Sequence, residues 1–247
     1  MATHSSLQHQ AHRPWPLPAR PWLLRQTWHD LLFLHWPVPA VILQPLLPAA
    51  LQVEEFAGTA WLAVTPFWMS DIGIRNWPTP PMLSRFDELN VRTYVRFGGR
   101  SGVWFFSLDA GSRLAVWGAR WLYRLPYVYA RMRHRPAGDD VLYDSERSVG
   151  AGFRARYGPT GPVNPSRPGS VEHWLTERYC LYTQSPAGEL ICAEVHHPPW
   201  PLQRAAAVIE RNDLLEPFGL AVSGPPPLLH FSRRLDVVVW SPCPVAA

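Results

Sequence analysis

The residues best suited to chemistry lie in one short stretch of the sequence, RFDELNVRTYV (85–95). Apolar and polar side chains alternate through it, as they do in a β-strand with two unlike faces. The polar face carries a carboxylate, an amide, a guanidinium and a phenol, from Glu88, Asn90, Arg92 and Tyr94. On the residues alone, this face either is exposed to water, as is common in antiparallel sheets, or lines a pocket in which it could hold a ligand.

Glu88 and Arg92 are too far apart on this strand to form an ion pair with each other. Residues four apart on a strand are separated by roughly 13 Å, at about 3.3 Å per residue. Each side chain therefore needs a partner on a neighbouring strand, in a ligand or in water. If the face lines a pocket, we expect Arg92 to bind an anionic group and Glu88 to accept a hydrogen bond from a hydroxyl or an amide.

Three further residues are candidates for the same pocket. His35, beside Trp36, is either a hydrogen-bonded core histidine or an acid/base group. Arg178 lies at an expected helix-to-strand corner, where structural pairing with a buried carboxylate is the simpler interpretation. Arg120, in the segment ARWLYRLPY (119–127), is a second candidate for an anion clamp.

Known catalytic and metal-binding motifs do not account for this sequence. Glu194 and His196 would share one face of a strand, but two candidate ligands fall short of the three or four that a dedicated metal site needs. The sequence contains no GxSxG, GxGxxG, P-loop or HExxH pattern, so acyl-enzyme hydrolases, dinucleotide oxidoreductases and NTPases have no support. We therefore predict no metal and no cofactor.

The basic residues are all arginine, because the sequence contains no lysine. A Schiff-base mechanism needs a lysine amine, so lysine-dependent covalent catalysis is excluded. The net charge is +4, and arginines are frequent between Arg113 and Arg135. Such a run could contact the phosphates of a nucleic acid. No nucleic-acid-binding signature accompanies it, and a solvated helix face is the simpler interpretation.

The composition favours a β-rich protein of the cytoplasm. Of 247 residues, 28 are proline, which interrupts helices and central strands, and 13 are tryptophan, which supplies large rigid surfaces for a core or a pocket. The three cysteines show no paired spacing, as expected in a reducing compartment. The apolar segment Leu31–Leu51 is not expected to cross a membrane, because it is interrupted by Pro37, Pro39, Pro45 and Pro48.

The pattern along the chain predicts one α+β domain over residues 25–247, preceded by a flexible, proline-rich arm over residues 1–24. The clearest element is a hairpin in which Gly98-Gly99 joins residues 88–97 to residues 102–108. Further strands are expected at residues 31–36, 52–56, 60–69, 149–157, 178–183 and 190–196 and near the end of the chain. Helices are expected at residues 39–48, 115–129, 170–177 and 201–211.

Seven blocks of sequence occur in order between residues 27 and 240: LLFLHWPVP, LQVEEFAGTAWLAVTPFWM, ELNVRTYV, GVWFFSLDA, ARWLYRLPY, LTERYCLY and VHHPPWPL. Together they resemble the uncharacterised bacterial DUF2071 family, also called YqjF-like, of the acetoacetate decarboxylase-like superfamily. The resemblance implies a curved, mostly antiparallel sheet that closes as a cone or incomplete barrel around an internal cavity, with a few short flanking helices. It supports the interpretation that the face from Glu88 to Arg96 lines a pocket.

The same resemblance implies a departure from the chemistry of the superfamily. Its decarboxylases form a Schiff base through a cavity lysine, assisted by glutamates and an arginine, and Glu88 looks like the counterpart of one such glutamate. The segment ARWLYRLPYVYA resembles a decarboxylase stretch that ends in Gly-aromatic-Pro-Lys, but Tyr127 follows Pro126 where those enzymes have lysine. Without that amine the imine cannot form, so the decarboxylase mechanism does not carry over.

The sequence therefore predicts a protein that binds a small anionic metabolite in an internal cavity without Schiff-base chemistry. We expect the cavity to be lined by Glu88, Asn90, Arg92, Tyr94 and Arg120, with His35 and Arg178 nearby. The alternative is an enzyme that uses non-covalent acid/base chemistry in the same cavity, with Glu88 as the base and Tyr127 or His35 as the acid. Hydration, isomerisation and lactone chemistry would fit. Nucleic-acid binding through residues 113–135 is the third hypothesis.

Overall fold

The computed structural model of the protein describes residues 4–79, 84–222 and 224–245 and is rich in β-structure, with 51% strand and 13% helix. The strands are β1 (Leu24–Val38), β2 (Gln52–Val53), β3 (Ala60–Ile74), β4 (Phe86–Phe97), β5 (Arg100–Ala110), β6 (Tyr127–Ala137), β7 (Asp140–Arg147), β8 (Gly152–Pro159), β9 (Cys180–Gln184), β10 (Leu190–His196), β11 (Gln203–Asn212), β12 (Leu228–Val239) and β13 (Cys243–Pro244). The α-helices are α1 (Ala40–Leu43), α2 (Arg113–Tyr123) and α3 (Val171–Thr176), and 3-10 turns lie at Ser5–Gln8, Gln44–Leu46 and Glu216–Phe218.

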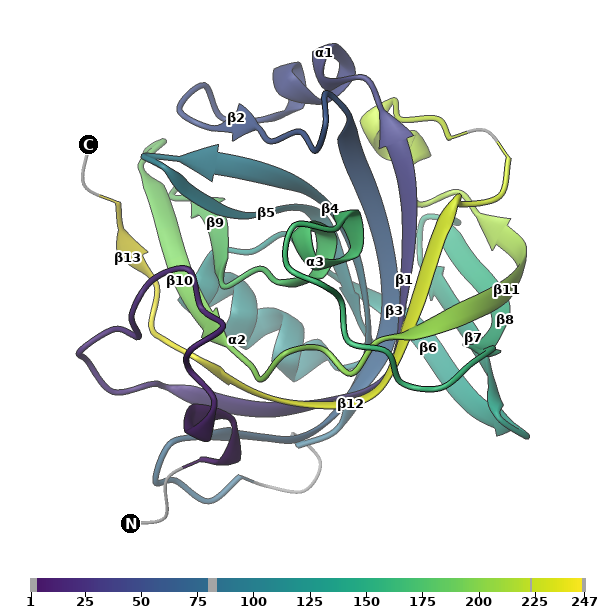
Figure 1. Ribbon diagram of the computed structural model, residues 1–247, viewed down its shortest axis with the longest axis horizontal. Helices are drawn as coiled ribbons and strands as arrows, with labels where there is room; N and C mark the ends of the chain where they lie inside the picture. The colour runs from purple at the N-terminus through teal and green to yellow at the C-terminus, as the bar shows by residue number, and fades with distance from the viewer. Residues whose placement is uncertain (1–3, 80–83, 223, 246–247) are drawn as a thin grey trace.

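Seven of the strands close into a ring, which we call the cavity ring. Each pairs with the next in the order β1, β3, β4, β5, β9, β10 and β12, and β12 pairs with β1 to complete the circle. These pairings are antiparallel except for the one between β5 and β9. Figure 1 shows the strands curving around the centre of the molecule. The curved, mostly antiparallel sheet with a few short helices is therefore confirmed.

A second closed path of strands, which we call the packed chamber, shares β12, β1, β3, β4 and β5 with the cavity ring and is completed by β6, β7, β8 and β11. Buried apolar side chains fill its interior, among them Leu32, Leu89, Tyr143 and Phe231. The shared strands thus have one face toward each compartment. Because both faces are buried, β1 reads as the nearly continuous apolar run LLFLHW.

The helix expected over residues 201–211 is wrong, because these residues form strand β11, which pairs with β8. Exposed and half-buried side chains alternate along it, and Arg204, Ala206 and Val208 are the exposed ones at its centre. Alanine is a strong helix former, so its abundance here favoured a helix from the sequence. The pairing with β8 across the sheet overrides that local preference.

The helix expected over residues 115–129 is shorter than predicted. It ends at Tyr123, where Arg124 adopts a left-handed conformation (φ 56°) and Pro126 follows, which favours extended backbone before it. The arginine-rich run from residue 113 to residue 135 is therefore divided between α2 and strand β6. It does not form a single helix face, and the arginines of its second half alternate along the exposed face of β6.

The proline-rich segment before β1 lies against β10. The Nη2 atom of Arg13 lies 2.9 Å from the carboxylate of Glu194, and the indole nitrogen of Trp15 donates to the same carboxylate at 2.9 Å. The ring of His196 also lies 2.9 Å from the backbone carbonyl oxygen of Ser6. These contacts place the segment expected to be a flexible arm on the outer side of the cavity ring.

Candidate functional site

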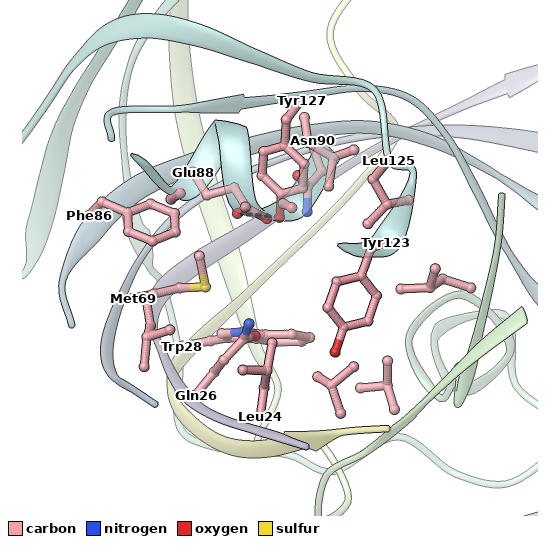
Figure 2. Close-up of a pocket in the computed structure, with 18 of the residues that line it drawn as sticks. Leu24, Gln26, Trp28, Met69, Phe86, Glu88, Asn90, Tyr123, Leu125 and Tyr127 are labelled. Carbon is pink, nitrogen blue, oxygen red and sulfur yellow. Dashed lines mark hydrogen bonds between the residues drawn. The ribbon is translucent and has the colours of Figure 1, made fainter. Parts of the chain in front are cut away.

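The cavity ring encloses a cavity of about 620 Å³, a volume in the range that holds small organic ligands. All seven strands of the ring contribute side chains to its wall, and α2 contributes a further part. The wall is therefore assembled from segments that are far apart in the sequence. Most of it is apolar, and Figure 2 shows the polar residues Glu88, Asn90 and Tyr127 close together on one part of it.

The polar face of β4 forms that part of the wall. Glu88, Asn90 and Arg92 line the cavity, whereas Leu89 and Val91 between them lie in the packed chamber. A slip of one residue in the pairing would exchange the two sets, so the apolar packing of one set fixes the position of the other. Of the two arrangements that the sequence leaves open, the structure has the one in which the polar face of this strand lines a cavity.

Glu88 and Tyr127 form a hydrogen-bonded pair in the cavity wall. The phenol of Tyr127 donates to the Glu88 carboxylate at 2.8 Å. Burial raises the pKa of Glu88 to about 7, against the opposing effect of hydrogen bonds from Tyr127 and Asn90. Burial and the neighbouring carboxylate together raise the pKa of Tyr127 well above its ordinary value. Near neutral pH, Glu88 can therefore either release or accept a proton, while Tyr127 stays protonated.

Arg92 carries a positive charge that no carboxylate balances among the described residues. None of their ion pairs includes Arg92, and its Nε atom has no hydrogen-bond partner among the same residues. Its guanidinium carbon instead lies 5.4 Å from the ring centre of Phe33 and 6.0 Å from that of Tyr94. Because arginine is always protonated in proteins, this part of the cavity is suited to an anionic group.

Arg178 also lines the cavity, but its charge is paired. Its Nη1 atom lies 2.5 Å from the carboxylate of Glu54, and its Nε donates to the backbone carbonyl of Trp174 at 2.7 Å. Burial alone would raise the pKa of Glu54, but Arg178 and hydrogen bonds from Ser101 and Arg96 lower it below its ordinary value. The structural pairing favoured from the sequence is thus present, and Arg178 mainly holds Glu54 in place.

His35 and Tyr94 lie behind the cavity wall and do not line it. The two rings are fully buried, and the Nε2 atom of His35 lies 2.7 Å from the Tyr94 hydroxyl. Burial, with the nearby Arg92, lowers the pKa of His35 well below its ordinary value, so the ring is neutral. Trp174 of α3 packs on Tyr94 with ring centres 5.0 Å apart. The expectation that Tyr94 lines the cavity is therefore wrong, since α3 and His35 cover it.

Arg120 lies outside the cavity, which corrects its expected place as an anion clamp. The side chain is exposed on α2, and its Nε donates to the backbone carbonyl of Tyr127 at 2.6 Å. The left-handed turn at Arg124 brings α2 and the start of β6 together, so this bond helps to position Tyr127. Arg120 thus supports the site from outside and does not face a ligand.

The cavity wall also contains buried polar atoms that have no hydrogen-bond partner in the part of the chain that the structure describes. Besides Asn90 Oδ1, Arg92 Nε and Arg178 Nη2, they include Thr65 Oγ1, Tyr123 OH and Trp200 Nε1. Buried polar groups are normally paired, so such a group in a cavity indicates a place where a ligand or solvent binds. Thr65, Tyr123 and Trp200 are not among the residues predicted from the sequence, although Thr65 follows the alternation of its own strand.

The fold of the molecule has counterparts among solved structures. A solved acetoacetate decarboxylase from Legionella pneumophila has the same fold, with a TM-score of 0.67 and 13% identity over 100% of this chain and 98% of that chain. The enduracididine biosynthesis enzyme MppR, in a complex with pyruvate, matches with a TM-score of 0.66 and 11% identity over 92% of this chain and 91% of that one. The fold is thus that of the acetoacetate decarboxylase-like proteins.

Within that class, the chain belongs to the DUF2071 family. The family model, described as an uncharacterized conserved protein, matches residues 25–236. The uncharacterized protein YqjF of Bacillus subtilis (strain 168) is 42% identical over 221 residues, which cover 89% of this chain and 91% of that protein. The resemblance seen in the seven sequence blocks is confirmed.

In the described part of the chain, no helix combines the length and apolar character that crossing a bilayer requires. Within the same residues, no three histidine, cysteine or acidic side chains lie together as a metal site would need.

Proposed function

We propose that the protein binds a small organic anion in the cavity and that Arg92 holds the charged group. One observation carries this proposal: the guanidinium of Arg92 lines the cavity without a carboxylate partner among the described residues. A partly buried cation is costly without a counter-charge, and an anionic ligand would supply one. Asn90 and Thr65, on the adjacent strand positions, would accept or donate the remaining hydrogen bonds.

The fold neighbours support a carboxylate as the ligand class. MppR has been solved with pyruvate, which is a small carboxylate. In this chain binding would not proceed through an imine, because the sequence has no lysine. We also propose that the protein works in the cytoplasm, because the spacing of its three cysteines in the sequence is not that of a disulfide framework.

A second candidate function is proton transfer on the bound ligand, and the Glu88–Tyr127 pair favours it. A carboxyl group with a pKa of about 7 in a largely apolar cavity is suited to act as a general base at neutral pH. Glu88 would take a proton from the ligand, and Tyr127 would donate a hydrogen bond to an oxygen on which charge develops. Hydration, isomerisation and lactone chemistry use such a pair.

Mass spectrometry of the metabolites that co-purify with the protein tests the binding proposal. Wild type is compared with Arg92→Ala and with Arg133→Ala, a matched control because Arg133 is exposed on β6 and does not belong to the cavity wall. We expect an anionic metabolite in the wild type and in Arg133→Ala, and its loss from Arg92→Ala. The same metabolite at the same occupancy in all three proteins would show that Arg92 is not the clamp.

Incubation of the protein with a cellular metabolite extract tests the catalytic alternative. Wild type should consume a compound that Glu88→Gln leaves untouched, because the amide keeps the shape of the side chain but cannot take a proton. If both proteins consume it, Glu88 is not the base. If neither consumes any compound while both retain the bound anion, the protein binds without catalysis.

A further inference from the structure

The cavity changes in character along strand β4. Arg92, Asn90 and Glu88 follow one another at every second residue toward the start of the strand, and Phe86, which pairs with Met69 of β3, comes next. At about 3.3 Å per residue, the main-chain positions of Arg92 and Phe86 lie roughly 20 Å apart. The cavity is therefore elongated along β4, with its cation at one end and apolar side chains at the other.

The apolar end opens at a rim of exposed tryptophans. Trp77, which follows β3, is 69% exposed, and Trp117 and Trp121 of α2 are 69% and 65% exposed, yet all three belong to the cavity wall. Leu114, Trp117 and Trp121 are spaced by three and four residues, so they form one stripe along α2. Large apolar side chains gathered at an opening are typical of a surface that an apolar group covers.

The wall between this rim and Arg92 is also apolar for much of its length. Trp28, Phe67, Met69 and Leu125 contribute to it, and Figure 2 shows Trp28 and Met69 facing the same open space as Glu88. An anion the size of pyruvate held at Arg92 would leave this surface in contact with water. A chain of methylene groups would cover it, with a gain that grows with each group buried. A protein partner could cover the rim but would not fill the interior.

We infer that the ligand is an elongated amphipathic carboxylate. Its carboxylate binds Arg92 at the end of the cavity away from the rim, and its unbranched apolar chain passes Glu88 and reaches the rim between Trp77 and the stripe on α2. This inference rests on the proposed function, because it uses Arg92 as the clamp, and it adds the chemical class of the rest of the ligand. It also gives the exposed tryptophans a role, which is to cover the end of the chain.

Calorimetric titration with butanoate, octanoate and dodecanoate, each below its micelle concentration, tests the inference. We expect the dissociation constant to fall by roughly fourfold for each added methylene until the chain reaches the rim. A dissociation constant that is the same for all three acids would overturn the inference. Binding that is lost in Arg92→Ala but independent of chain length would leave the proposed function intact and reject the amphipathic ligand alone.

Octanol, which has the apolar chain but no carboxylate, separates the contribution of the carboxylate from that of the chain. Octanol should bind to wild type much more weakly than octanoate does. Its affinity for Arg92→Ala should equal its affinity for wild type, because octanol has no charge for Arg92 to bind. If octanol and octanoate bind with the same affinity, Arg92 does not bind the carboxylate, and only the apolar part of the site is supported. If neither the acids nor octanol bind, the amphipathic ligand is rejected, and the metabolites that co-purify with wild type and Arg92→Ala decide the proposed function separately.

The rim is tested by Trp117→Ser and Trp121→Ser. Each should weaken dodecanoate by roughly tenfold, the loss expected when one or two methylenes lose their cover, and leave butanoate unchanged. Val208→Ser is the matched control, because Val208 is 66% exposed on β11 and does not belong to the cavity wall. Equal weakening by all three substitutions would show that the rim has no specific role.

Discussion

The two faces of strand β4 show how the same alternation of side chains serves two different compartments. Toward the packed chamber, β4 presents Leu89 and Val91, which are fully buried among other apolar side chains. Toward the cavity it presents Glu88, Asn90 and Arg92, with space in front of them. A filled compartment needs complementary shapes, whereas the open one can keep polar groups that would be costly in a packed core.

The two compartments also differ in how the charge of an arginine is balanced. In the packed chamber Arg147 binds Asp109 through Nη2 at 2.6 Å and donates to Ser107, and Asp109 accepts a further bond from Ser145. Burial raises the pKa of Asp109 above its ordinary value, although the bonds from Arg147 oppose this effect. Arg92 of the cavity has no such partner among the residues described. The charge of Arg147 is thus balanced within the protein, whereas that of Arg92 is not balanced by a carboxylate among these residues.

The largest effect that would sharpen this comparison is expected from Asp109→Ala. It leaves Arg147 buried without a counter-charge, and we expect a loss of about 3–5 kcal/mol in the free energy of unfolding. Arg92→Ala should cost less than about 1 kcal/mol, because it breaks no ion pair. Urea unfolding measures both. Equal losses of unfolding free energy in the two variants would mean that Arg92 contributes as much to stability as the Arg147–Asp109 pair.

A truncation on each face of β4 should give the next largest difference. Leu89→Ala opens a hole in the packed chamber and should cost about 2–5 kcal/mol. Asn90→Ala, on the adjacent residue, enlarges a space that already exists and should cost less than about 1 kcal/mol. Thermal or urea unfolding of the pair tests this. A large loss for Asn90→Ala would indicate that the cavity face is packed as well.

The pH dependence of stability should report the burial of Glu88. Its pKa is about 7 in the folded protein against an ordinary value of 4.5, so between these values the folded state keeps a proton that the unfolded chain has released. The stability should therefore fall as the pH rises from about 4.5 to 7, by on the order of 3 kcal/mol from this group. The control is Glu88→Gln, whose stability should lack this component. If the stability of both proteins depends on pH in the same way, burial does not raise the pKa of Glu88.

The smallest effect is expected from removing one phenol hydroxyl in each compartment. The hydroxyl of Tyr143 lies 2.9 Å from the carbonyl oxygen of Phe67 and 2.7 Å from that of Glu88, so Tyr143→Phe should cost about 1–2 kcal/mol. The hydroxyl of Tyr123 in the cavity wall has no hydrogen-bond partner within residues 4–79, 84–222 and 224–245, so Tyr123→Phe should change the stability by less than about 0.5 kcal/mol. Urea midpoints compare the two, and a reversed order would break the distinction between the compartments.

Much of the site strand could be predicted because its signals are local. The alternation from Glu88 to Val95 and the Gly98-Gly99 turn fix the hairpin of β4 and β5 without knowledge of the rest of the fold. The compartment that each face meets depends on strands distant in sequence. Arg178, for example, finds its carboxylate on Glu54, which is 124 residues away. No spacing rule in the sequence gives such a pairing.

The predictions that are wrong concern places where tertiary contacts override local preference. Residues 203–212 are alanine-rich but become a strand because β8 offers an edge to pair with. Arg120 and Tyr94 were placed in the cavity by residue type, whereas the position of α2 and the cover of α3 put them outside it. Strand β1 is buried on both faces, so its sequence does not alternate between apolar and polar residues. Its two faces could therefore not be assigned to two compartments from the sequence.

Cysteine accessibility along β4 tests most directly whether its polar face lines an open, cationic cavity. Asn90→Cys and Val91→Cys are made in a protein whose three native cysteines are replaced by serine, and each is treated with an anionic and a cationic methanethiosulfonate of similar size. Cys at position 90 should react in the folded protein, faster with the anionic reagent because of Arg92, and Cys at position 91 should react only after unfolding. Equal reaction at both positions, or a preference for the cationic reagent at position 90, would contradict the account.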